Sequence, residues 1–385
     1  MTGSIRRRGR RSWELNFDLG RDPVTGARLR RFVTVKGTRR DAERALAEAI
    51  HRHNTGLDVA YGKMTVAQYL RRWLSDYAET NVSAATLVRY RGIVANHLVP
   101  LIGTVQLTEL RPAHIQAAYA RTLANGARKD GRDGSLSART VLQHHRVLRE
   151  ALSHAVRWQL LARNPADAVA TPKPTRHELR VLDRGEAQGL LDSCAQDPLH
   201  CLIYMALVTG ARLGELLALR WRDIDGATQT VRITRTAQRI PGKGIVFHAP
   251  KTHRSIRPIA LSPVALRILK THRTAQAERR LAMGGDYADH DLVFATALGA
   301  PLDGTNVTKN FQRLARDAGL GHVRFHDLRH SAATLMLAAG THPKIVSERL
   351  GHATVNITLD TYSHVLPDMQ HEAAIVIDQL LTRTK

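Results

Sequence analysis

Four short segments in the second half of the chain carry residue types suited to attack on a phosphodiester. Each holds a cation, an imidazole or a phenol close to the end of an expected helix or strand. The segments are Thr209-Gly210-Ala211-Arg212-Leu213-Gly214-Glu215, Pro250-Lys251-Thr252, His326-Asp327-Leu328-Arg329-His330, and Leu350-Gly351-His352 followed by Thr361-Tyr362-Ser363-His364.

Cleavage of a DNA phosphodiester without a metal needs fixed cations, because the transition state places extra negative charge on two non-bridging oxygens. Arginine suits this task, since its planar fork binds phosphate oxygens in pairs and keeps its charge. Arg212 and Arg329 are the two candidates. His326 lies three residues before Arg329 on the same helix face, so both side chains can point at one phosphate.

Tyr362 is the candidate nucleophile. Its reference pKa of about 10 means that nearby cations or a base must favour the phenolate. The leaving sugar oxygen needs a proton, and we expect Lys251 to supply it from between two strands. Lys243, at the other turn of the same hairpin, stays open as the alternative donor. His326 and His352 are expected to transfer protons and to donate a hydrogen bond to the phosphate.

Two further residues are expected to support this set. Glu215 lies one turn after Arg212 and would orient the arginines, and His330 would support its neighbours. His326 and His330 also have the i, i+4 spacing of a zinc-binding helix. The general-base Glu of that motif would fall at 327, where the chain has Asp327, and no carboxylate cluster suits a two-metal nuclease. We therefore favour chemistry without a metal.

In these residues the sequence resembles the tyrosine recombinase family, and in particular the phage-type integrases. The pattern of that family is Arg, Lys, His-x-x-Arg, His or Trp, and then Tyr. In this chain it falls, in the same order, on Arg212, Lys251, His326, Arg329, His352 and Tyr362. The resemblance is strongest in the last half of the chain.

The resemblance implies a site-specific recombinase that integrates or excises a phage or another mobile element. Tyr362 would attack the scissile phosphate, form a 3′-phosphotyrosyl link and free a 5′-hydroxyl, and the partner duplex's 5′-hydroxyl would then resolve the link. The link keeps the energy of the broken bond, so no ATP is implied. Because arginine and lysine handle the charge, no metal cofactor is implied either. A homotetramer on core-type and arm-type DNA sites is implied as well, with a host DNA-bending protein and an excision factor as further candidate partners.

Two alternatives to this function stay open. A basic DNA-binding regulator without catalytic activity would share the charge, but it has no need of the six-residue set. A strand-relaxing enzyme of the type IB topoisomerase kind would share the chemistry and rejoin the same strand. The extra basic segment at the N-terminus favours recombination between two sites.

The charge of the chain indicates a polyanionic partner. Its 57 lysines and arginines outnumber its 34 acidic residues, giving a formal charge of +23. Surfaces of this kind bind nucleic acid by releasing counterions. The residues expected to contact DNA first are Arg6, Arg7, Arg8, Arg10 and Arg11.

The sequence predicts a cytoplasmic protein. No run approaches the roughly 18–20 apolar residues of a membrane helix, and no apolar stretch of a secretory signal follows the basic start. Cys194 and Cys201 fit no metal-binding or redox spacing.

The elements that must position these residues predict an α+β fold, mainly α, in three domains. Residues 1–60 predict a small basic β-sheet with one helix, and residues 64–168 predict an all-α domain. Residues 177–385 predict a mixed catalytic domain of helices and β-hairpins with a C-terminal tail. By the resemblance, the first domain binds arm-type sites and the second binds core-type sites.

Hydrophobic spacing and capping residues place the expected elements. The expected strands are Trp13–Leu19, Leu29–Val35, Val231–Thr234, Ile245–Phe247 and Ser255–Ile259. The expected helices include one beginning at Thr38, one over Val66–Tyr77, one from Ser83 ended by Pro100, one from Arg111 to Asn125 and one over Ser137–Leu161. An amphipathic stretch, Glu372–Leu381, would dock either on its own domain or, as the resemblance suggests, on a neighbouring subunit.

Overall fold

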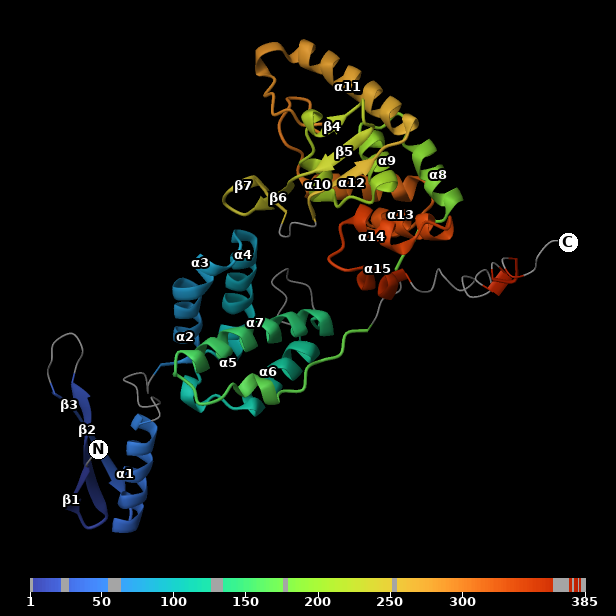
Figure 1. Cartoon of the computed structure of the whole chain (residues 1–385). Coiled ribbons are helices and arrows are strands. Elements are labelled where there is room, and N and C mark those ends of the chain that lie inside the picture. Colours follow the sequence, from blue (N-terminus) through green and yellow to red (C-terminus); the bar gives the residue numbers. More distant parts are fainter. Residues whose placement is uncertain are drawn as a thin grey trace. The chain divides into compact units, whose positions relative to one another are not determined.

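The structure is a computed structural model that describes residues 3–21, 28–54, 64–125, 134–175, 179–250 and 255–362, and in the tail residues 374, 375, 377–379 and 381. Its contacts divide the chain into two compact units, Met1–Arg176 and His177–Lys385. Within the described residues, no helix is long and apolar enough to cross a membrane. The fold is mainly helical with small sheets, as the sequence predicts (Figure 1).

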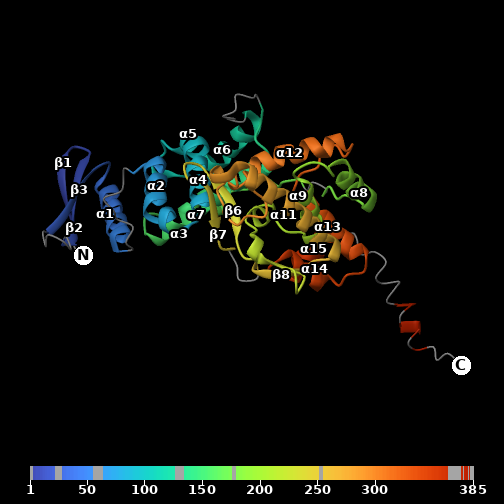
Figure 2. The same ribbon diagram turned by 90° about the horizontal axis from the view of Figure 1, so that it is seen from above.

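The first unit begins with an antiparallel sheet covered on one side by a helix (Figures 1 and 2). The strands are β1 (Gly3–Gly9), β2 (Ser12–Arg21) and β3 (Arg28–Lys36), which pair in this order, and the helix is α1 (Arg39–Asn54). Leu15 and Phe17 lie two residues apart in β2, so their side chains point to the same face of the sheet. Helix α1 packs against this strand, and both side chains are buried. The small basic sheet with one helix is thus confirmed, while strand β1 is an addition to the prediction.

In residues 64–125 and 134–175, the rest of the first unit that the structure describes, the regular elements are helices, and their core contains the aromatic stripe of Tyr69 and Trp73. Its α-helices are α2 (Val66–Trp73), α3 (Glu79–Asn81), α4 (Ala84–Ile93), α5 (Val99–Ile102), α6 (Pro112–Asn125) and α7 (Ala138–Arg157). The N-caps Thr65, Ser83 and Ser137 each accept a hydrogen bond from the third residue beyond.

The prediction that Pro100 ends its helix is wrong. The chain widens into a π-helical turn over Val94–Leu98 and then continues as α5 through Pro100 to Ile102. A proline inside a helix removes one backbone donor and clashes with the carbonyl four residues earlier. We attribute the tolerance of Pro100 to the wider turn that precedes it.

The second unit places two small antiparallel sheets among helices. One sheet has the order β4-β5-β8, and β6 pairs with β7 as a hairpin. The strands are β4 (Ile224–Asp225), β5 (Thr230–Ile233), β6 (Thr236–Ile240), β7 (Gly244–His248) and β8 (Arg257–Ala260). The helices are α8 (Arg184–Ser193), α9 (His200–Thr209), α10 (Leu213–Leu217), α11 (Pro263–Met283), α12 (Gly304–Asp317), α13 (Asp327–Ala338), α14 (Pro343–Leu350) and α15 (Val355–Tyr362).

The buried helix α9 organises this unit. Leu202, Ile203 and Met205 are fully buried in its core, and α9 packs against both α11 and α13. Helix α13 in turn contacts α14, and α14 contacts α15, so the three lie together in Figure 1. Three of the four chemistry-bearing segments fall at the ends of α9, α13, α14 and α15, while Lys251 and Thr252 of the fourth lie outside the described residues.

Candidate active site

Arg329, on α13, connects two of the other candidate segments. Its side chain is 3% exposed, and its Nη1 donates hydrogen bonds to the carbonyl of Gly210 at 2.7 Å and to that of Leu350 at 2.8 Å. Each carbonyl lies two residues before a candidate, Arg212 in one case and His352 in the other. The Nη2 atom is buried and has no hydrogen-bond partner among the described residues.

Arg212 is the N-cap residue of α10 and is held by Glu215. The Nη1 atom of Arg212 donates to Oε1 of Glu215 at 2.9 Å, while its backbone N–H donates to Oε2 at 3.0 Å. The Arg212 side chain remains 43% exposed, whereas that of Glu215 is 4% exposed. Glu215 therefore holds the backbone and one guanidinium nitrogen of Arg212, while much of the Arg212 side chain stays exposed to solvent.

The phenol of Tyr362 lies at the end of α15 and contacts α13. The Tyr362 hydroxyl and Nδ1 of His330 are 2.8 Å apart, and the ring of His330 meets that of His326 edge to face at 5.0 Å. Tyr362 is 1% exposed. It packs in a cluster with Ala333, Leu337, Val346 and Leu350.

His352 follows the left-handed Gly351 that ends α14. Its Nδ1 lies 2.8 Å from the hydroxyl of Thr358, so its Nε2 is the ring atom left for another partner. His352 is half-buried, and the hydrogen bond to α15 fixes the orientation of its ring.

Comparisons with known proteins agree with this arrangement. Residues 180–369 match the Phage integrase family, and residues 65–123 match the Phage integrase, N-terminal SAM-like domain. The chain is 28% identical over 391 residues to a tyrosine recombinase XerC-like protein of Caldanaerobacter subterraneus subsp. tengcongensis, covering 97% of each chain. It is 30% identical over 309 residues to the integrase of Mycobacterium phage L5, covering 78% of this chain and 75% of the relative. The chain belongs to the phage integrase family of tyrosine recombinases.

Solved structures share the fold of this integrase. The Tn1549 transposon integrase in complex with a circular intermediate DNA has a TM-score of 0.68 at 19% identity, covering 82% of this chain and 99% of that chain. A lambda integrase tetramer bound to a Holliday junction has a TM-score of 0.53 at 19% identity, covering 91% and 95%. The family membership makes the chain a site-specific recombinase, an enzyme that cuts and rejoins DNA strands, of the kind that acts on mobile elements.

Burial and positive charge shift the pKa values of Arg329 and Glu215 in the integrase site. Burial alone would raise the pKa of Glu215, but the hydrogen bonds and charges of Arg257 and Arg212 hold it below its usual value. Burial, and then the charge of Arg212, lower the pKa of Arg329 to about 9. The site thus carries an excess of positive charge that a phosphate would relieve.

The imidazoles and the phenol are neutral at neutral pH for the same reasons. Burial lowers the pKa of His330 to about 4, with a further contribution from His326. Burial, followed by the charges of Arg329 and Arg212, lowers the pKa of His352 to about 4. Burial raises the pKa of Tyr362 to about 12, although Arg329 opposes the shift. The Tyr362 hydroxyl therefore shares its hydrogen bond with a neutral His330.

The structure brings together five of the six catalytic candidates: Arg212, His326, Arg329, His352 and Tyr362. The sixth, Lys251, lies outside the described residues. Lys243, its alternative, is an exposed residue in the turn between β6 and β7. No group of three His, Cys, Asp or Glu side chains in the described ranges is placed to hold a metal ion.

Two residues of the site were not predicted. Thr358 holds His352, and nothing in its local sequence distinguishes it from other helical threonines. Arg257 pairs with Glu215, and a signal for it exists. It lies two residues before the buried Ile259 in β8, so the two side chains share the inward face, and a buried arginine there needs a carboxylate.

Proposed function

We propose that Tyr362 is the nucleophile of a two-step strand exchange. Its hydroxyl oxygen attacks the scissile phosphorus, the bond to the 5′ oxygen breaks, and a 3′-phosphotyrosyl link forms. The 5′-hydroxyl of a partner duplex then attacks this link and releases the phenol. Because each step exchanges one phosphodiester for another, the reaction needs no ATP.

The observation that supports this proposal most directly is the Nη2 of Arg329, which finds no hydrogen-bond partner in the part of the chain that the structure describes. A buried guanidinium donor without a partner is costly, and a phosphate oxygen would supply the missing acceptor. Arg212, half-exposed beside it in the fold, would hold a second oxygen. We assign Nε2 of His352 and the ring of His326 to the same phosphate, and Lys251 to protonation of the leaving 5′ oxygen.

Tyr362 must leave its present packing to reach a phosphate, because only 1% of its surface is exposed. It is the last residue of α15, so a shift of this helix end would release it. We infer that DNA binding favours the released position. The hydrogen bond between His330 and the phenol holds Tyr362 until then.

The wider assembly is also part of the proposal. We assign residues 1–60 to arm-type DNA, residues 64–168 to core-type DNA and residues 177–385 to catalysis. Exposed arginines support the first assignment; they are Arg6, Arg7, Arg8, Arg10 and Arg11. We further propose a homotetramer on DNA, in which the exposed Ile375, Ile377 and Leu381 of the tail dock on a neighbouring copy. The lambda integrase tetramer on a Holliday junction shows the same fold in such an assembly.

A nicked suicide substrate carrying the element's attachment sequence tests the proposal, because loss of the short 5′-hydroxyl strand traps the covalent link. The wild-type integrase should form an adduct that survives denaturing electrophoresis, with or without EDTA. Tyr362→Phe should bind the DNA equally well and form no adduct, while Tyr287→Phe is the matched control and should behave as wild type.

Two outcomes would contradict the proposal. An adduct formed by Tyr362→Phe would assign the nucleophile elsewhere. Joining that only ever restores the original strand, even when a partner duplex is supplied, would indicate a strand-relaxing enzyme.

A further inference from the structure

Arg257, on β8, is a buried arginine that lies outside the six-residue catalytic set. Its side chain is 6% exposed. Burying a guanidinium is expensive unless all of its donors find acceptors. In Arg257 each of the three guanidinium nitrogens has an acceptor, through four hydrogen bonds to Glu215, Arg349 and Ser255. The first two of these residues lie in or beside segments that carry catalytic candidates.

The first of these contacts is with Glu215. Nη2 of Arg257 donates to Oε2 of Glu215 at 2.9 Å, and Nη1 approaches Oε1 at 3.4 Å. The same two carboxylate oxygens accept from the side chain and backbone of Arg212. Glu215 is thus shared between a buried arginine that anchors it and a half-exposed arginine that faces the site.

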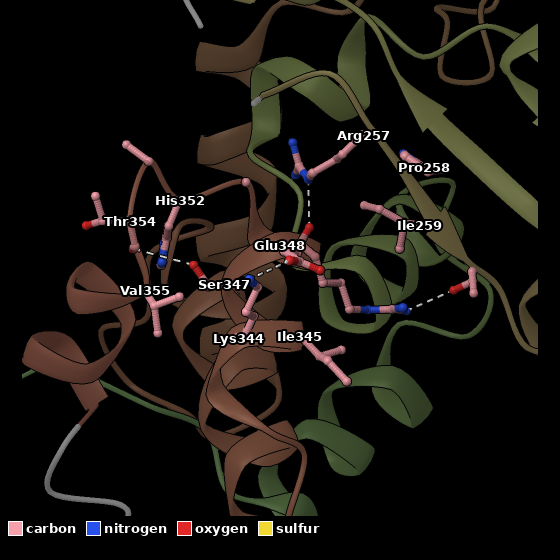
Figure 3. Close-up of a pocket in the computed structure, with 14 residues that line it drawn as sticks. Arg257, Pro258, Ile259, Lys344, Ile345, Ser347, Glu348, His352, Thr354 and Val355 are labelled. Atoms are coloured by element: carbon pink, nitrogen blue, oxygen red, sulfur yellow. Dashed lines mark hydrogen bonds and ion pairs between the residues drawn. The ribbon is translucent and has the colours of Figure 1, made fainter. Parts of the chain in front are cut away.

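The second contact is with the end of α14. Nε of Arg257 donates to the carbonyl of Arg349 at 2.6 Å, as Figure 3 shows. Gly351 lies directly against the guanidinium: at φ +69°, a Cβ on this residue would fall 2.8 Å from Nη1 of Arg257. The contact therefore fixes the helix end that leads straight into His352.

The third contact is with Ser255, which lies two residues before Arg257. Nη1 of Arg257 donates to the carbonyl of Ser255 at 3.0 Å. Each of the three guanidinium nitrogens therefore donates at least one hydrogen bond within the described part of the protein. With its side chain 6% exposed, Arg257 anchors neighbouring segments and offers little surface to a substrate.

We propose that Arg257 is a positioning residue of the recombinase, which holds Arg212 through Glu215 and His352 through the C-terminal end of α14. This inference rests on the proposed function, because it concerns the placement of residues assigned to the phosphate. A lysine cannot replace it, since one ammonium group cannot bind the carboxylate and the Arg349 carbonyl in the geometry of the fork. The role is to set geometry, and displacements of about 1 Å at a reacting centre cost on the order of 10²-fold in rate.

The test compares Arg257→Met, Arg257→Lys and the double variant Glu215→Gln/Arg257→Met in the full-length protein. Arg257→Met alone leaves the carboxylate of Glu215 buried without its arginine partner. The double variant also removes that negative charge, so it should fold even if the single variant does not. The control is Arg220→Lys, which disrupts the Arg220–Asp223 ion pair elsewhere in the same unit. Melting temperature, affinity for the attachment DNA and single-turnover adduct formation at saturating DNA are measured for each.

We expect both Arg257 variants and the double variant to lose on the order of 10²-fold in single-turnover rate, with affinity for DNA changed less than about threefold. Arg220→Lys should lower the melting temperature and keep the wild-type rate. The pH profile provides a second readout. Arg257 holds the pKa of Glu215 down, so without it Glu215 takes up a proton at a higher pH and releases Arg212. In Arg257→Met, the fall of the single-turnover rate on the acidic side of the pH profile should begin at a higher pH. The double variant should not show this shift.

Wild-type rates and an unshifted acid limb in Arg257→Met would overturn the inference. So would a loss of rate that only follows the loss of folded protein, as judged against Arg220→Lys. If the wild-type protein itself forms no adduct, the proposed function fails and the inference fails with it. An active wild type with fully active Arg257 variants overturns the positioning role alone.

Discussion

The guanidinium of Arg329 is held in place without being neutralised. Its two partners are backbone carbonyls, which orient Nη1 but carry no full charge. Arg212 adds a second positive charge nearby and contributes to lowering the pKa of Arg329. The two guanidinium groups repel each other, and in the proposed mechanism the negative charge of a bound phosphate reduces this repulsion. The stabilisation is largest in the transition state, where the negative charge is greatest.

Replacing Arg329 with alanine is therefore expected to slow single-turnover cleavage by about 10²–10³-fold, the usual effect of losing one such donor. Arg329→Lys should recover only part of the rate, because it keeps the charge and loses the fork. Quenched-flow or gel-based single-turnover assays at saturating DNA measure both. Near-normal cleavage by Arg329→Ala would show that the phosphate binds elsewhere.

At the scale of single residues, the sequence predicts which cations and which phenol are catalytic candidates, and of the residues that anchor them it predicts only Glu215 and His330. Residue type and order single out Arg212, Arg329 and Tyr362, because phosphoryl chemistry limits which side chains can act. The pairing of Glu215 with Arg257 spans 42 residues and depends on the strand β8 meeting α10, which no local pattern records. The burial of Tyr362 depends likewise on the packing of α15 against α13 and α14.

The joint between α9 and α10 shows how elements place the site. Gly210 ends α9 in the left-handed conformation at φ +63°, and its carbonyl accepts a hydrogen bond from Arg329. An added Cβ would collide with the Leu350 side chain, in the turn before His352. One glycine thus lets three candidate segments approach one another.

Gly210→Ala is expected to destabilise the protein by more than the roughly 1–2 kcal/mol that the left-handed conformation costs a residue with a side chain. The added collision should also displace the segment carrying His352 and slow cleavage. Gly242→Ala is the matched control, because Gly242 has φ +77° in the turn between β6 and β7 with open space around its Cβ position. Thermal melts and single-turnover rates compare the two, and equal effects would contradict this role for Gly210.

Most helices and strands could be predicted from the sequence, and the exceptions have identifiable causes. Caps and apolar spacing place α2, α7 and β5 closely, because both signals are local. Strand β1 was not predicted, since its run of arginines has no alternation and its order comes from pairing with β2. The extension of α5 through Pro100 required a π-helical turn that leaves no mark in the sequence.

At the scale of the whole molecule, the charge of +23 and the exposed arginines of the first sheet suit a chain that holds DNA through several surfaces. The catalytic candidates described here all lie in the unit His177–Lys385. The sequence shows the composition of each part of the chain. The proposed assignment of these parts to arm-type DNA, core-type DNA and catalysis rests on the family and not on the pattern of residues.

Deleting residues 1–60 is therefore expected to leave adduct formation at core-type sites within a few-fold of the full-length rate while it reduces integration. The reason is that the catalytic residues and the helical segment before them remain, whereas the basic sheet is lost. Integration between two plasmids and adduct formation on a suicide substrate measure the two effects separately. Loss of core-site cleavage in the truncated protein would show that the basic sheet takes part in the cleavage itself.

The central claim is that one phenol near the C-terminus becomes covalently joined to DNA. It is tested most directly by digesting the trapped wild-type adduct with protease and nuclease and identifying the modified peptide by mass spectrometry. The account predicts a single peptide carrying a nucleotide joined through its 3′-phosphate to Tyr362. A nucleotide on any other residue, or one joined through a 5′-phosphate, would contradict it.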